Sequence, residues 1–162
     1  MAKIIIVDEN DNEIGLKERG TLNFDDIYRV SALWITNSKG EVLLAQRSFN
    51  KKQNAGQWGP AVAGTVEGGE SYDSNITKEA KEELSLEKTE FKKGPKIRYS
   101  DKNYNYFGQW YFLNINKVID DFKIQKEEVE QIQWFSKDKF YEIYLKTPTI
   151  FISGVKERFD EF

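Results

Sequence analysis

The chain lacks two of the residue types on which enzyme chemistry most often depends. Its 162 residues include no cysteine and no histidine. Without cysteine there is no disulfide bond, no thiolate nucleophile and no zinc held by sulfur. Without histidine there is no imidazole ligand and no histidine general base. Any acid–base chemistry must therefore depend on carboxylates, lysine, tyrosine or metal-bound water.

The chain also lacks a long apolar run and an excess of positive charge. No stretch has the length and apolar character of a membrane-spanning helix, and residues 1–20 carry no secretion signal. A net charge of −3 argues against general binding to nucleic acids or acidic membranes. We expect one domain over residues 1–162, located in the cytoplasm, with neither nucleic acid nor membrane as a partner. Its oligomeric state, a homodimer included, stays open.

A glycine-rich turn precedes a strongly charged helix. The turn covers residues 64–70 and reads Gly-Thr-Val-Glu-Gly-Gly-Glu. After it, Glu79, Glu82 and Glu83 lie at i, i+3 and i+4, so they share one helical face. The adjoining face is apolar and can dock the helix on a sheet. Its members recur every four residues: Tyr72, Ile76, Ala80 and Leu84.

Three carboxylates on one helical face repel one another unless something offsets their charge. A hard divalent cation such as Mg²⁺ takes carboxylate oxygens, keeps several waters and bridges to phosphate. The acidic face therefore favours metal chemistry directed at phosphate. A merely solvated acidic face is the competing interpretation, and the helix alone does not separate the two.

The spacing of the turn and the helix resembles the Nudix box. In order it reads Gly64, five residues, Glu70, seven residues, Lys78-Glu79, two residues, Glu82-Glu83, one residue and Ser85-Leu86. The first glycine and all four glutamates of the box are matched. The chain departs from it at three positions, where the family has arginine, a bulky aliphatic residue and glycine: Lys78, Ala80 and Ser85.

These departures bear on activity more than on fold. Lysine is a point charge where arginine offers a planar fork, so Lys78 orients its partner glutamate less tightly. Ser85 replaces a glycine suited to a left-handed helix cap, so either it costs about 1 kcal/mol there or the helix ends by another route. A catalytically weak or silent Nudix module that binds a nucleotide or a protein is therefore the alternative to an active enzyme.

The resemblance implies an α/β fold, the Nudix-type α/β/α sandwich with a mixed β-sheet. The residue patterns agree with it. Strands are expected at residues 4–7, 14–16, 29–36, 41–47, 61–63, 92–100, 104–115 and 131–135, with a hairpin turn at 37–40. Helices are expected after a cap at Ser71 or Asp73, and at residues 137–145 and 148–159.

The resemblance also implies a metal-dependent hydrolase that cleaves a diphosphate linkage in a nucleoside diphosphate derivative or a similar small organic diphosphate. The implied catalytic residues are Lys78, Glu79, Glu82 and Glu83. The implied ligands of Mg²⁺ or Mn²⁺ are Glu79, Glu82 and Glu83, with the Ala63 carbonyl. Glu128 is the candidate for an extra carboxylate ligand, and a solvated acidic turn explains it equally well. The residues expected to support the site are Gly64, Gly68, Gly69 and Glu70.

Contacts to the substrate are harder to place. The candidates are Arg47, Lys51, Lys52 and Trp58, of which the lysines are equally explained by solubility. An aromatic wall is a further option, with ordinary core packing as its alternative. Its members would be Trp58, Tyr104, Tyr106 and Trp110.

The segment upstream of the box is similar to Nudix proteins related to isopentenyl-diphosphate isomerase. It covers Arg29-Val30, residues 39–48, Lys51-Lys52 and Gly56-Gln57-Trp58. Isomerases of this kind use a cysteine and a histidine-containing metal site, and the chain has neither residue type. Isomerase activity is therefore disfavoured.

Overall fold

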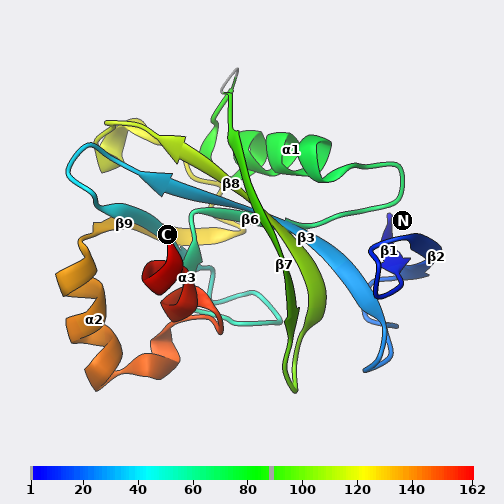
Figure 1. Ribbon diagram of the computed structural model, residues 1–162. Helices are drawn as coiled ribbons and strands as arrows, with labels where there is room; N and C mark the ends of the chain where they lie inside the picture. Colours follow the sequence, from blue (N-terminus) through cyan, green and yellow to red (C-terminus); the bar gives the residue numbers. More distant parts are fainter. Residues whose placement is uncertain (1, 88–89) are drawn as a thin grey trace.

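The structure, a computed structural model, describes residues 2–87 and 90–162. Within these residues the chain forms one nine-stranded sheet and three α-helices (Figure 1). The strands are β1 (Lys3–Val7), β2 (Glu13–Glu18), β3 (Ile27–Thr36), β4 (Val42–Arg47), β5 (Trp58–Pro60), β6 (Val62–Thr65), β7 (Lys92–Ser100), β8 (Asn105–Asn114) and β9 (Val129–Phe135). The helices are α1 (Tyr72–Leu84), α2 (Lys137–Lys146) and α3 (Val155–Glu161).

Strand β3 organises the sheet. One of its edges pairs in parallel with β8 over residues 28–36. The other edge pairs antiparallel with three strands in succession, first β1, then β6 and then β4. The sheet is therefore mixed, as the sequence predicted. This arrangement brings β6, which leads into the glycine-rich turn, against the middle of β3.

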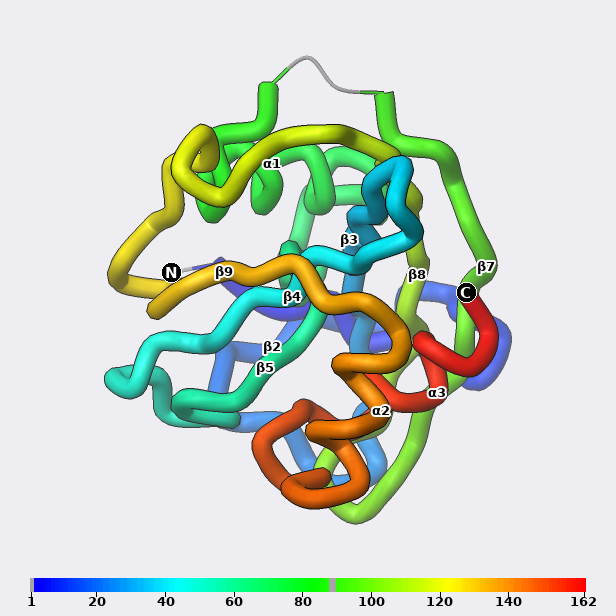
Figure 2. The backbone as a smooth tube through the Cα atoms, turned by 90° about the vertical axis from the view of Figure 1, so that its left-hand side faces the viewer, coloured from blue at the N-terminus to red at the C-terminus, as the bar shows by residue number. Residues whose placement is uncertain are grey.

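The alternation of side chains along the strands divides the core into two layers. Leu33 and Ile35 of β3 pack on the side that α1 covers, while Trp34 between them packs on the side of α2 and α3. Figures 1 and 2 show α1 above the sheet and α2 with α3 on its opposite side. Helices on both faces of a mixed sheet confirm the predicted α/β/α sandwich.

Helix α1 begins where the sequence predicted. Ser71 is its N-cap, and the Ser71 hydroxyl accepts a hydrogen bond from Ser74 N at 3.0 Å while Ser74 Oγ accepts one from Ser71 N at 2.9 Å. The helix buries Ile76, Ala80 and Leu84 against the sheet. These three residues belong to the expected apolar stripe, so the adjoining face of α1, with its carboxylates, has a fixed orientation.

The predicted helix over residues 148–159 is interrupted. Pro148–Ile150 form one turn of 3-10 helix, and α3 begins only at Val155. Between them, Ile152 N donates to the carbonyl oxygen of Trp58 at 2.8 Å, so the backbone is extended alongside β5. Gly154 then has φ of +97°, a conformation that ends any continuous helix. A backbone contact made over a long sequence distance therefore overrides the helical pattern.

Asp11, in the loop between β1 and β2, joins this hairpin to the rest of the fold. Its side chain is 6% exposed, and Arg29 Nε and Lys96 Nζ each approach the carboxylate to 2.7 Å. The Tyr72 hydroxyl donates to it at 3.0 Å. Burial by itself would raise the pKa of Asp11, but hydrogen bonds from these three residues outweigh burial and hold the pKa below its usual value. Asp11 therefore connects the hairpin to β3, α1 and β7.

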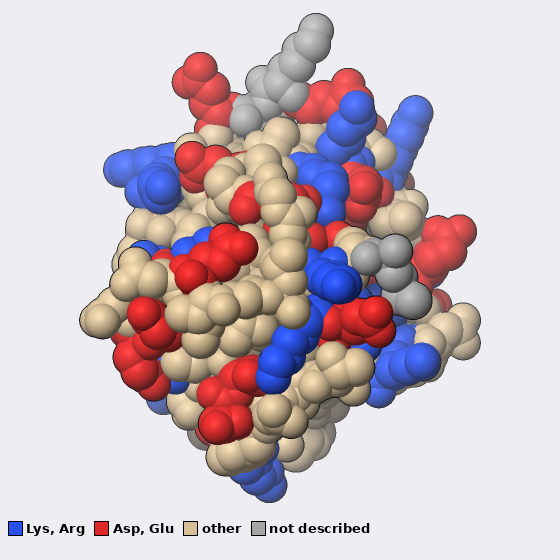
Figure 3. Space-filling view, turned by 90° about the vertical axis from the view of Figure 1, so that its right-hand side faces the viewer, with Lys and Arg blue, Asp and Glu red and all other residues tan. Residues whose placement is uncertain are grey.

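Two broader properties of the molecule follow from the described residues. Across residues 2–87 and 90–162, no helix is both long and apolar enough to cross a bilayer. The face drawn in Figure 3 carries acidic and basic side chains interspersed, without a large patch of one sign.

Candidate functional site

The first glycine of the turn makes room for a glutamate of the helix. A Cβ atom on Gly64 would lie 2.5 Å from Cγ and 2.7 Å from Cδ of Glu79. Both distances are far shorter than carbon atoms tolerate. Only glycine at the end of β6 therefore lets the Glu79 side chain lie between α1 and the sheet.

The two later glycines are required by the path of the turn. Gly69 has φ of +87°, which disfavours other residues. At Gly68 a Cβ atom would lie 3.1 Å from Cδ2 of Leu16, so a side chain would press against β2. Both glycines shape the turn from outside the cavity described below.

Glu70 holds the turn and the helix together. Its carboxylate accepts hydrogen bonds from Glu67 N at 2.8 Å and from Asn75 Nδ2 at 3.1 Å, and Lys78 Nζ lies 2.8 Å away. Burial acts to raise the pKa of Glu70, but the bonds from Lys78 and Glu67 N outweigh it, and the pKa is lowered. The ionised Glu70 carboxylate therefore links the glycine-rich turn to α1. Lys78 lies nearer to Glu70 than to Glu79, whose Oε1 is 3.7 Å away.

Asn75 is a supporting residue that the sequence analysis missed. It is fully buried on α1, and its side-chain oxygen accepts a hydrogen bond from the Ser31 hydroxyl of β3. Its amide nitrogen donates to the Thr65 carbonyl at 3.2 Å and to Glu70. Asn75 therefore fixes the position of α1 against β3 and β6. A polar residue directly beside the apolar stripe was the available signal.

Glu79 and Glu83 form a partly buried pair on one face of α1. Their carboxyl groups lie close enough for each to shift the pKa of the other. Burial raises the pKa of Glu79, and burial together with the charges of Glu79 and Glu128 raises the pKa of Glu83 well above its usual value. Two carboxyls this close cannot both ionise cheaply, so the pair retains a proton or needs a compensating positive charge.

Two further carboxylates, those of Glu82 and Glu128, lie near this pair but do not converge on it. Glu82 is exposed, and Glu128 Oε2 is bound by Lys51 Nζ at 2.5 Å. In the described part of the chain, no three acidic side chains converge closely enough to enclose a metal ion as they stand. Rotation of Glu82 or Glu128 toward Glu79 and Glu83 would add a third carboxylate to the pair. Their oxygen donors suit a hard divalent cation.

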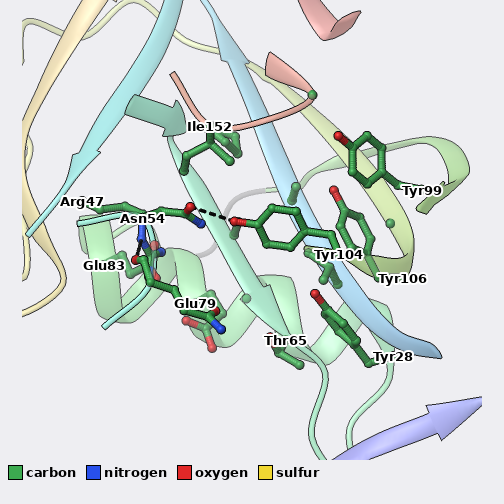
Figure 4. A pocket seen from close by; sticks show the side chains of 18 of the residues that line it. Tyr28, Arg47, Asn54, Thr65, Glu79, Glu83, Tyr99, Tyr104, Tyr106 and Ile152 are labelled. Atoms are coloured by element: carbon green, nitrogen blue, oxygen red, sulfur yellow. Dashed lines mark hydrogen bonds between the residues drawn. The ribbon is translucent and has the colours of Figure 1, made fainter. Parts of the chain in front are cut away.

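A cavity of about 650 Å³ opens beside the pair, a volume within the range of small-molecule sites. Glu79, Glu83 and Arg47 line one end of the cavity, and a cluster of tyrosines lines the other end (Figure 4). The expected site residues that line it are Arg47, Lys51, Ala63, Gly64, Lys78, Glu79, Glu82, Glu83 and Glu128. The structure thus brings together residues from β4, β6, α1 and the loops before β5 and β9.

Trp58 and Lys52 do not belong to this group. Trp58 is 8% exposed and packs edge-on against Phe135, with 5.4 Å between the ring centroids. Its ring thus lies in the core layer beneath α2 and α3, which corrects the expectation that it contacts substrate. Lys52 is exposed and is not among the residues lining the cavity.

The aromatic end of the cavity combines expected and unexpected residues. Tyr104, Tyr106 and Trp110 line it, as the aromatic wall would require. Two further residues that sequence analysis missed also line it, Tyr28 of β3 and Arg158 of α3. The parallel register of β3 and β8 places Tyr28 directly beside Tyr106, and no local pattern reveals that register.

Comparison with known proteins gives a consistent result. A 27% identity over 136 residues relates the chain to an isopentenyl-diphosphate Delta-isomerase of Citrobacter koseri, covering 81% of this chain and 75% of that protein. An isomerase of Klebsiella pneumoniae is 24% identical over 153 residues, covering 91% and 83%.

Among solved structures, the Deinococcus radiodurans protein DR0079 matches with a TM-score of 0.78 and 20% identity over 89% of both chains. The MutT protein of Methanosarcina mazei matches with a TM-score of 0.61 and 23% identity, over 83% of this chain and 94% of that one. The family description "NUDIX domain" matches residues 27–151. That segment includes the glycine-rich turn, the acidic helix and most of the cavity, and the chain belongs to the NUDIX domain family.

Proposed function

We propose that the chain is a divalent-metal-dependent hydrolase that cleaves a diphosphate linkage in a nucleoside diphosphate derivative or a similar small organic diphosphate. One observation carries the proposal. The partly buried Glu79–Glu83 pair lies at one end of a cavity in which Arg47 and Lys51 supply positive charge. Carboxylates that favour a cation and basic groups that favour phosphate oxygens therefore share one site.

Each residue has a distinct part in the proposed reaction. Mg²⁺ or Mn²⁺ held by Glu79, Glu82 and Glu83 would neutralise phosphate charge and acidify water. Arg47 is held by a hydrogen bond from its Nε to the Gln53 carbonyl at 3.0 Å, which leaves its terminal nitrogens for phosphate. Lys51 can exchange its contact with Glu128 for a phosphate oxygen.

A glutamate accepts the proton of the attacking water in this proposal, because the chain offers no imidazole and carboxylates line the cavity. Glu79 is our candidate, since Gly64 fixes its position and Lys78 lies 3.7 Å from its carboxylate. Glu70 and Asn75 hold the turn and α1 in place without entering the cavity.

Two alternatives remain distinct from this proposal. The first is the isomerisation named for the curated relatives, which the absence of cysteine and histidine disfavours. The second is a silent module, for which the lysine at position 78 and the serine at position 85 are the only indications. The intact set of Glu79, Glu82 and Glu83 argues against it.

The test is metal-dependent release of phosphate or monophosphate from a panel of nucleoside, sugar and prenyl diphosphates. We expect turnover with Mg²⁺ or Mn²⁺ and none after chelation. Glu83→Gln should lower the rate by about 10²-fold or more. Glu142→Gln, an exposed position on α2, is the matched control and should not change it. Absence of turnover across the panel would favour the silent module.

A further inference from the structure

Two tyrosine hydroxyls at the aromatic end of the cavity have no hydrogen-bond partner within residues 2–87 and 90–162. Tyr28 and Tyr106 lie side by side on β3 and β8, with 5.7 Å between their ring centroids. Among the residues that the structure describes, neither hydroxyl makes a hydrogen bond, and neither is sealed off from the cavity. Figure 4 shows both rings on the wall opposite Glu79 and Glu83.

The neighbouring tyrosines differ in this respect. Tyr104 donates its hydroxyl hydrogen to Asn54 Oδ1 at 2.7 Å, and Tyr99 donates to Asp101 Oδ2 at 3.0 Å. The hydroxyls of Tyr99 and Tyr104 are thus engaged by neighbouring loop residues. Those of Tyr28 and Tyr106 are available to a ligand.

Arg158 adds positive charge at the same end. It lines the cavity from α3 and is 7% exposed, and its guanidinium lies 5.8 Å from the ring centroid of Trp110. Nη2 contacts Glu161 at 3.1 Å, whereas the buried Nε has no partner within the described residues. Arg158 lies beyond residue 151, where the match to the family ends. This charge is therefore a feature of the chain rather than of the matched family segment.

The two hydroxyls remain protonated at neutral pH. Burial, with the charges of Tyr104 and Asp101, raises the pKa of Tyr28 to about 12. Burial also raises the pKa of Tyr106, and its neighbours Tyr28 and Tyr99 add to the shift. Both groups can therefore donate hydrogen bonds to a ligand under ordinary conditions.

The unpartnered groups decide which ligand is favoured. An acceptor-bearing group can replace the water that these hydroxyls otherwise bind. A hydrocarbon group would displace that water and leave the hydroxyls unsatisfied, at about 1–3 kcal/mol for each one. A site built to hydrogen-bond a ligand rejects the analogue that lacks the bonding atoms far more strongly than a purely apolar site can.

We propose that Tyr28, Tyr106 and Arg158 form a polar subsite that binds hydrogen-bond acceptors on the organic group attached to the diphosphate, and that selects against hydrocarbon groups such as prenyl chains. The subsite rests on the proposed function, because the ligand is taken to be an organic diphosphate. It separates the chain from its curated relatives by ligand chemistry, in addition to the missing cysteine and histidine.

Binding of non-hydrolysable analogues tests the subsite without relying on turnover. The probes are the α,β-methylene analogue of ADP and geranyl methylenediphosphonate, measured by calorimetry with Mg²⁺ present. Wild-type protein should bind the ADP analogue at least about 10-fold more tightly. Tyr28→Phe with Tyr106→Phe should weaken that binding about 5-fold or more, because two hydrogen bonds are lost, and should leave geranyl binding unchanged or tighter.

Tyr141→Phe is the matched control, since the Tyr141 hydroxyl bonds to Asp160 and does not line the cavity. It should leave both affinities unchanged. Equal losses for both analogues, no loss for the ADP analogue, a preference of wild-type protein for the geranyl analogue, or failure of both to bind would overturn the subsite. If the expected selectivity is found while no diphosphate is hydrolysed, the proposed hydrolase fails and the subsite stands.

Discussion

The side chain of Glu79 fills the space beside Gly64, and a Cβ atom on Gly64 would lie 2.5 Å from Glu79 Cγ. The first glycine of the box and the first glutamate of its helix are thus a steric pair. Glycine is needed at position 64 because the Glu79 side chain fills the space where a Cβ atom would lie. The φ angle of Gly64 lies outside the left-handed region, so backbone conformation is not the reason. This relationship gives a substitution that separates stability from activity.

We expect Gly64→Ala to lower hydrolysis by at least about 10-fold while lowering the free energy of unfolding by only about 1–2 kcal/mol. The added methyl group forces the flexible Glu79 side chain out of its place, which costs the site more than the core. Activity assays and urea unfolding measure the two effects. Gly15→Ala is the control, since nothing lies within 4 Å of a Cβ there. Full activity of Gly64→Ala would show that Glu79 need not occupy this position.

We expect Glu83→Gln to raise the thermal stability of the metal-free protein at pH 8, although it lowers activity. Burial raises the pKa of Glu83, so the folded state is penalised wherever this group is ionised. The gain in Tm of the variant over wild type should be present above the carboxyl pKa of the unfolded chain and should disappear below about pH 4. Tm measured against pH with chelator checks it, and a variant less stable than wild type at pH 8 would contradict it.

Asp11→Asn should destabilise the fold by about 2 kcal/mol at pH 7, because Arg29 and Lys96 lose a mostly buried carboxylate. The pKa of Asp11 is lowered in the folded state, so its contribution is present above the unfolded pKa and is lost as pH falls through the folded value. Urea unfolding should therefore show a smaller difference in the free energy of unfolding between wild type and variant at pH 3 than at pH 7. A constant difference would mean that the carboxylate charge is not what stabilises the hairpin.

Ser85→Gly should stabilise the protein by about 0.5–1 kcal/mol. Ser85 caps α1 with φ of +56° and ψ of +33°, the left-handed conformation that glycine adopts without penalty. Ser85→Ala keeps the strain and removes the contact of Ser85 Oγ with the Lys123 carbonyl, so it should not stabilise. Urea unfolding of both variants decides the matter. Equal effects of glycine and alanine would exclude backbone strain as the cause.

The sequence predicted the parts of the structure that local patterns determine. The period of α1, its Ser71 cap and the hairpin between β3 and β4 each depend on residues close together in the chain. The box places Glu79 and Glu83 on one face for the same reason. Fold and family both followed from these segments.

What the sequence did not predict depends on contacts between distant segments. The break before Gly154 arises from the backbone bond between Ile152 and Trp58. The same packing against β5 and β9 places Trp58 in the core. Arg158 reaches the cavity only because α3 follows that extended segment, so helical periodicity alone could not assign it.

The parallel pairing of β3 with β8 also bears on how the protein folds. Strands β4 to β7 and helix α1 all lie between these two partners in the chain, so their pairing closes a long loop before it gains any contact energy. Topologies dominated by such pairings fold in milliseconds to seconds rather than microseconds. Tyr28 and Tyr106 come together only in that step. We therefore expect contact between these two rings to form later in folding than α1, whose hydrogen bonds join residues close together in the chain.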